Sequence, residues 1–254
     1  MKLKIYKSEK FLHNPLKLVA AQVNFEEVGS DVLHKQARQF QKQMGENWVK
    51  LVPQENSVIS INSNNRANIE QSVRKEYRLN TGDDLGTIVI SSDHVTLEVK
   101  KYDGWENFSK LFERVCSATE KIFDPSNQLR LGVRFVNDFV LPVEKENWKG
   151  LIPDEILGLA GSEMFMDGVL ASDQRTILVF EDNTKCILRH ALIKTNPNTS
   201  RPNFLLDFDS FDDIQVKFDK SEIMQKADRL HQNIGNSLTS CITDEMHSWL
   251  VGGK

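Results

Sequence analysis

Residues 129–141 read LRLGVRFVNDFVL and carry the clearest strand signal in the chain. Apolar residues at positions 129, 131, 133 and 135 alternate with Arg130 and Arg134, which is typical of a strand with one buried and one polar face. The turn-forming residues DPSNQ at 124–128 precede it. We therefore expect a sheet to be built around this strand.

Two helices are expected before this strand. The first should start at Asp31, a good N-cap residue, because the apolar positions 33, 37, 40 and 44 fall on one helical face. The second should start at Asp103, which has capping-box spacing to Glu106. Its inner face should carry Trp105, Phe108, Phe112, Val115, Thr119 and Ile122.

Strands are expected between these helices and at the start of the chain. The candidate ranges are 15–26, 48–61, 73–79, 87–90 and 95–102, with a polar turn at 62–68. The turn-like residues 91–94 should join the last two ranges into a hairpin.

The second half repeats this order loosely. A short helix near 152–159 should be followed by strands near 164–171, 176–181, 185–194 and 203–209, and by a long helix from 221 towards 250. The sequence thus predicts an α+β fold with mixed or mostly antiparallel sheets, packing helices and a long C-terminal helix. Two similar halves, 1–128 and 129–254, are expected to pack as one unit.

Composition and charge narrow the class of protein. The 254 residues are 39% hydrophobic and 27% charged, which is ordinary for a globular chain. No apolar run approaches the ~20 residues of a membrane span, and residues 1–17 lack the apolar core of a signal peptide. We expect a cytoplasmic protein without a membrane partner. Its three distant cysteines should be reduced and mostly buried.

The charge balance also bears on partners. The net charge is −4, with 32 basic and 36 acidic residues spread along the chain. Nucleic-acid-binding proteins usually show a basic excess or stripe. This balance argues against nucleic acid as the main partner, although local basic patches leave it as an alternative.

Several segments together resemble a sporadically distributed bacterial and archaeal family of roughly this length. They are NPLKLVAAQVNF, LEVKKYDGWENF, LRLGVRFVNDF, LLDFDSF and LHQNIGNSLTSCIT. They include a Tyr-x-x-Trp-x-x-Phe signature at 102–108 and an Arg-x-x-x-Arg-aromatic-x-Asn signature at 130–137. The family has no known biochemical role, so no active site is carried over. The resemblance implies an accessory role encoded by horizontally mobile genes. Defence against phage is one example of such a role.

One set of residues matches a nuclease core. The predicted order from residue 31 is helix, three strands, helix, strand, as in restriction-endonuclease-like enzymes. Asp84 or Asp93 precedes Glu98 and Lys100, which point to one side of a strand and could hold Mg²⁺ or Mn²⁺ and orient water. The same alternation also describes any half-exposed strand. We favour that simpler interpretation and keep the nuclease as an alternative.

Asp207 and Asp209 share a strand face in an acidic cluster and form a second candidate metal site. The cluster lacks the glycine and the closing glutamate of an EF-hand loop. A charged, solvated edge strand that resists aggregation is the favoured interpretation.

Arg130, Gly132 and Arg134 form the candidate ligand-binding surface. Gly132 would admit a ligand between two arginines that could clamp an anion. Alternatively, the arginines pair with Glu98, Asp207 or Asp209 on neighbouring strands, and we favour this ion-pair interpretation.

The sequence contains no phosphate-binding loop, nucleophile elbow or zinc motif. We therefore expect a non-catalytic protein-interaction or regulatory component of an accessory bacterial system, with a protein partner or self-association and no cofactor. A metal-dependent nuclease and an RNA- or nucleotide-sensing module remain the alternatives.

Overall fold

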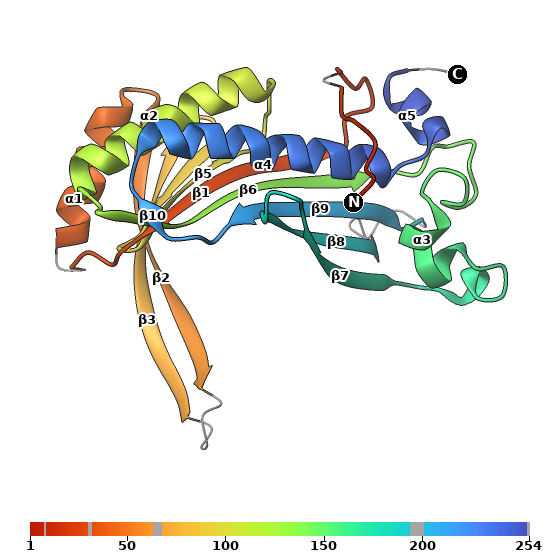
Figure 1. Ribbon diagram of the computed structural model, residues 1–254, viewed down its shortest axis with the longest axis horizontal. Helices are drawn as coiled ribbons and strands as arrows, with labels where there is room; N and C mark the ends of the chain where they lie inside the picture. The colour runs from red at the N-terminus through yellow and green to blue at the C-terminus, as the bar shows by residue number, and fades with distance from the viewer. Residues whose placement is uncertain (8, 30–31, 63–67, 194–200, 253–254) are drawn as a thin grey trace. The chain divides into compact units, whose positions relative to one another are not determined.

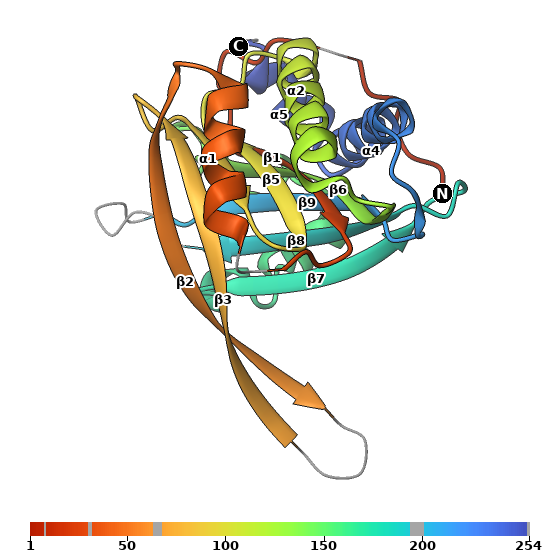
Figure 2. The same cartoon turned by 90° about the vertical axis from the view of Figure 1, so that its left-hand side faces the viewer.

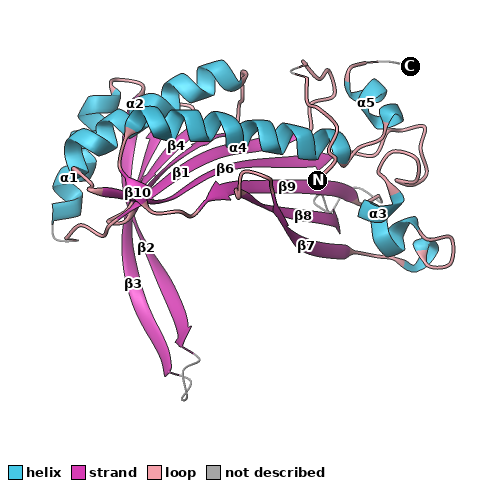
Figure 3. Ribbon diagram, viewed as in Figure 1, coloured by secondary structure: helices cyan, strands magenta, loops and turns pink. Residues whose placement is uncertain are grey.

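The computed structural model describes residues 1–7, 9–29, 32–62, 68–193 and 201–252, with the backbone alone at 56–62, 68–74 and 167. Over these residues the protein is an α+β fold with five α-helices and a ten-stranded antiparallel sheet (Figure 3). The predicted fold class is confirmed. Within the described ranges, no helix is long and apolar enough to cross a membrane.

The strands follow the order β2-β3-β4-β5-β1-β6-β9-β8-β7, and β10 pairs with β6 (Figure 1). The strands are β1 (Leu16–Phe25), β2 (Trp48–Asn62), β3 (Asn68–Thr81), β4 (Gly86–Ile90), β5 (His94–Val99), β6 (Asn127–Phe139), β7 (Ser172–Val179), β8 (Lys185–Ile193), β9 (Asn203–Asp212) and β10 (Val216–Lys217). The helices are α1 (Leu33–Met44), α2 (Trp105–Phe123), α3 (Asp154–Leu157), α4 (Lys220–Ser240) and α5 (Asp244–Leu250), with 3₁₀ turns η2 (Gly158–Gly161) and η3 (Met166–Gly168).

The chain divides into two compact units, each built from separate stretches of sequence. The hairpin unit contains Ala20–Leu131 and Ile214–Met224. The terminal unit contains Met1–Val19, Gly132–Asp213 and Gln225–Lys254, and so holds both ends of the chain.

The hairpin unit packs α1 and α2 together over an aromatic core. The predicted inner face of α1 is confirmed, because Leu33, Ala37, Phe40 and Met44 are all buried. Most of the predicted face of α2 is buried as well, including Phe108 and Phe112. The predicted hairpin at 87–102 is also confirmed, because β4 and β5 pair antiparallel across residues 91–93.

The terminal unit packs α4 against its strands. On β8, Cys186, Leu188 and His190 are buried and alternate with partly exposed Lys185, Ile187 and Arg189. Contacts such as the one between the Phe135 and His231 rings, 5.6 Å apart, join β6 to α4. The three cysteines of the chain are free and buried, as predicted.

The structure corrects one of the predicted strands. The strand predicted at 164–171 does not form and gives way to the 3₁₀ turn Met166–Gly168. Met164 and Leu170 are 82% and 86% exposed, so no neighbouring strand buries their apolar side chains.

Both predictions about helix ends also need correction. The capping box of Asp103 is wrong, because α2 has Gly104 at its N-cap and Asp103 instead accepts hydrogen bonds from Asn107. The predicted last helix is two helices. A new N-cap at Thr243 starts α5, and its hydroxyl accepts a hydrogen bond from the Met246 amide at 3.2 Å. The N-cap predicted at Asp31 lies outside the described residues.

Candidate functional site

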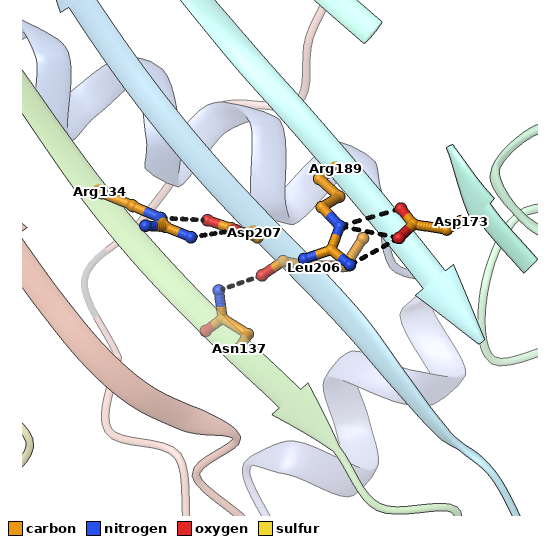
Figure 4. A network of polar contacts seen from close by, with 6 residues as sticks. All are labelled: Arg134, Asn137, Asp173, Arg189, Leu206 and Asp207. Atoms are coloured by element: carbon orange, nitrogen blue, oxygen red, sulfur yellow. Dashed lines mark hydrogen bonds and ion pairs between the residues drawn. The ribbon is translucent and has the colours of Figure 1, made fainter. Parts of the chain in front are cut away.

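The polar face of the terminal-unit strands carries a network of arginines and aspartates (Figure 4). Arg134 on β6 donates to both carboxylate oxygens of Asp207 on β9, from Nε at 2.8 Å and from Nη2 at 2.7 Å. The Asp207 side chain is only 7% exposed, whereas that of Arg134 is 47% exposed. The hydrogen bond to Asp207 raises the pKa of Arg134, so the guanidinium group stays charged.

A second bidentate pair lies further along the same face (Figure 4). Arg189 on β8 donates to Asp173 on β7 from Nε at 2.9 Å and from Nη2 at 2.6 Å. Both side chains are about half exposed, at 41% and 52%. The hydrogen bond from Arg189 lowers the pKa of Asp173. This exposed pair contributes less to stability than the first, because water screens it.

The residues of the arginine signature have distinct structural roles. Arg134 binds Asp207, and the neighbouring Phe135 packs on His231 of α4. Asn137 is buried and donates to the backbone carbonyl of Leu206 at 3.2 Å (Figure 4). The signature thus ties β6 to β9 on its polar side and to α4 on its apolar side.

Arg175 differs from the other arginines of this face. It lies on β7 directly opposite Arg189 in the register of the two strands. Its side chain is exposed, and it has no hydrogen bond or ion pair with any described residue. Like charges directly opposite each other on neighbouring strands are destabilising. A cavity of about 230 Å³ on this face is lined by Arg134, Arg175, Ile187, Arg189, Asp207 and Asp209.

Of the predicted ligand-binding residues, only Arg134 lines this cavity. Arg130 is half-buried on β6 in the hairpin unit, and Gly132 is buried at the start of the terminal-unit part of β6. Arg134 is engaged by Asp207, in agreement with the ion-pair interpretation. A ligand clamp formed by Arg130, Gly132 and Arg134 remains a prediction.

The interpretation of Asp207 and Asp209 as a solvated edge strand is wrong. Strand β9 lies between β6 and β8, so it is an interior strand. Asp207 is buried because Arg134 neutralises it, and half-buried Asp209 lines the cavity. Nowhere in the described part of the chain do three or more His, Cys, Asp or Glu residues form a group that could hold a metal ion.

The candidate nuclease residues each have a separate setting in the hairpin unit. Asp84 lies in the β3–β4 turn with a φ of 57° and pairs with Lys50 at 2.8 Å. Asp93 contacts His94 at 2.7 Å, and Glu98 pairs with Arg78 at 2.9 Å. Lys100 is exposed just beyond β5. The structure therefore does not bring the candidate nuclease residues together into one metal site, and the nuclease alternative receives no support from this geometry.

The sequence did not predict the length of the β2–β3 hairpin. The two strands pair from Trp48 and Thr81 out to Asn62 and Asn68, whereas β3 pairs with β4 only from Tyr77 to Asn80. The part beyond Tyr77, residues 54–62 and 68–76, is called the hairpin arm below. Figure 2 shows the arm projecting away from the rest of the hairpin unit. The candidate functional features of the chain are therefore this arm and the polar network.

No known family model and no curated protein matches the chain. The family resemblance noted from the sequence remains a prediction.

Proposed function

We propose that this protein is a non-catalytic interaction or regulatory component whose hairpin arm binds another protein chain. The observation that carries the proposal is the pairing of the arm. Over residues 54–62 and 68–76, β2 and β3 are hydrogen-bonded to each other, and no other described strand flanks them.

An isolated two-stranded ribbon is marginally stable in water, because it buries little apolar surface. Its outer edges also present backbone N–H and C=O groups that can accept another strand. Proteins commonly recognise extended segments by adding a strand to such an edge. A partner that covers the arm would satisfy these groups and bury its surface.

The proposed setting is the cytoplasm of a bacterium, in an accessory system such as anti-phage defence. This part of the proposal is supported only by the family resemblance of the sequence. The proposal includes no cofactor and no membrane partner.

The test removes the arm and keeps the remaining strands. Residues 55–75 are replaced by an Asn-Gly turn, which joins Gln54 to Glu76 at a position where the two strands are already paired. Affinity purification from the native host then compares the full chain with this variant. We expect a stoichiometric protein partner with the full chain only, and an unchanged melting temperature for the variant. A partner that binds both chains equally, or no partner for either, would refute the proposal.

An RNA- or nucleotide-sensing module is the second candidate, and the cavity beside Arg134 and Arg175 favours it. The guanidinium groups of Arg134 and Arg189 each keep an Nη1 that does not bond to its aspartate. Such groups suit a phosphate. Calorimetric titration with nucleotides and short RNA would detect this function directly, and Arg175→Ala should then abolish binding.

A further inference from the structure

Strand β7 forms an open edge of the sheet. It is last in the strand order, and its one neighbour among the described strands is β8. Most of its side chains are exposed on both faces, including Ile177 at 60% and Val179 at 57%. Leu170, just before the strand, is 86% exposed. An edge with free backbone groups and exposed apolar side chains is suited to pairing with another strand.

The sequence of this edge is complementary to itself in the antiparallel direction. Residues 170–178, which begin two residues before β7, read LASDQRTIL, with Gln174 at the centre. When the segment lies antiparallel to a copy of itself about Gln174, apolar residues face apolar ones, hydroxyls face hydroxyls and an acid faces a base. The facing residues are Leu170 and Leu178, Ala171 and Ile177, Ser172 and Thr176, and Asp173 and Arg175. Opposite-charge pairs and Ser–Thr pairs across strands are stabilising, and the facing apolar residues would bury surface against each other.

We propose that two copies of the protein pair through β7, antiparallel about a twofold axis at Gln174, and form a homodimer. The charges select this register. Moving the axis to Arg175 would place two arginines opposite each other, and moving it to Asp173 would do the same with two aspartates. Both arrangements are destabilising.

The pairing also accounts for Arg175. Within its own chain this side chain lies opposite Arg189, whose aspartate partner is Asp173. In the dimer, Arg175 faces Asp173 of the second copy. A carboxylate can accept hydrogen bonds from two guanidinium groups, so Asp173 can serve both arginines. Each copy thus supplies the carboxylate that Arg175 of the other copy lacks.

The interface is small and should be reversible. It involves only residues 170–178 of each chain. A standard stable interface uses roughly 20–30 residues and roughly 800 Å² per partner. We therefore expect a dissociation constant of roughly 1 to 100 µM.

This inference extends the proposed interaction role to self-association, and it uses no residue of the hairpin arm. Deletion of the arm and substitutions in β7 therefore test the two proposals separately. An arm-deleted chain that still dimerises would leave this inference standing even if no other partner is found.

The first test exchanges charges and measures mass by sedimentation velocity over a concentration series that brackets the expected dissociation constant. Arg175→Asp and Asp173→Arg each place like charges opposite one another, so each variant alone should dimerise at least tenfold more weakly than the wild type. Mixed together they should form a heterodimer, because two acids then face two bases. Arg229→Asp, at an exposed position of α4, makes the same charge change elsewhere and should dimerise normally. A monomeric wild type, or an Arg175→Asp variant that dimerises like the wild type, would overturn the proposal.

The second test fixes the register and does not depend on charge. In the proposed dimer Gln174 faces itself at a Cα separation of about 4.5–5.5 Å, which is within disulfide range. Gln174→Cys should therefore cross-link under mild oxidation, against a background of native cysteines that are all buried. Thr176→Cys should not, because its copies would lie ~14 Å apart along the strand. Cross-linking through position 176 and not 174 would show that this register is wrong.

Discussion

Replacing Arg134 by methionine should destabilise the protein, because it leaves a buried carboxylate without its partner. Asp207 is 7% exposed and accepts two short hydrogen bonds from the guanidinium group. Hydrogen bonds to charged groups contribute about 1.5–3 kcal/mol, and breaking a fully buried ion pair costs about 3–5 kcal/mol. Arg134 is nearly half exposed, so solvent screening reduces these figures and we expect a loss of about 2 kcal/mol. That corresponds to a fall of roughly 4–8 °C in melting temperature.

The assay is thermal and urea unfolding of a double-mutant cycle. Arg134→Met and Asp207→Asn are measured alone and together, and the coupling energy between them should be about 1–2 kcal/mol. Arg189→Met is the matched control, because its pair with Asp173 has the same bidentate geometry but is exposed on both sides. It should cost less than about 1 kcal/mol. If Arg134→Met costs no more than Arg189→Met, the pair is not structural and Arg134 is available to a ligand.

Three further predictions concern other parts of the chain. Burial lowers the pKa of His231 from 6.5 to about 4, so the unfolded chain binds the extra proton first as pH falls. The free energy of unfolding should therefore carry no penalty from His231 above pH 6.5 and should be lower by about 2 kcal/mol at pH 5. Urea unfolding of His231→Phe should not show this loss between pH 6.5 and pH 5. Gly235→Ala should lower stability by about 1 kcal/mol and expose the N-terminal segment to proteolysis, because a Cβ there would lie 2.5 Å from the Tyr6 ring and 2.9 Å from the Tyr6 Cβ. Combining it with Tyr6→Gly, which removes both the ring and the Cβ, should remove the clash. The purified chain should not cleave DNA or RNA with Mg²⁺ or Mn²⁺, and cleavage that disappears in Glu98→Ala would contradict the proposed function.

The helices of the hairpin unit could be predicted because their apolar positions recur with a helical period. Every predicted core position of α1 is buried, and that pattern depends on nothing distant in the sequence. The helix ends could not be predicted as well. The break between α4 and α5 lies at Thr243, which caps α5. The Thr243 hydroxyl also donates to the Gly150 carbonyl at 2.7 Å, and Gly150 is far away in the sequence.

The candidate site was predicted only in part, because its residues come from four strands. Arg134 and Asp207 were identified as candidates from the alternation in their own strands, and their pairing was one of several options. Arg175 and Arg189 were not predicted. Their strands carry the same period-two pattern as many others, and only the register of β7 on β8 places the two arginines opposite each other.

The self-complementary segment shows that the position of a strand in the sheet matters as much as its amino-acid sequence. The sequence pattern placed strands at 164–171 and 176–181, so Gln174 fell in the connection and the symmetry about it had no structural meaning. The structure instead places 172–179 in one strand. A self-complementary strand in the sheet interior would have both edges occupied and could not meet its copy. Because β7 is at the edge, the same residues can face those of a second chain, and Asp173 can bind Arg189 within its own chain and Arg175 of the other.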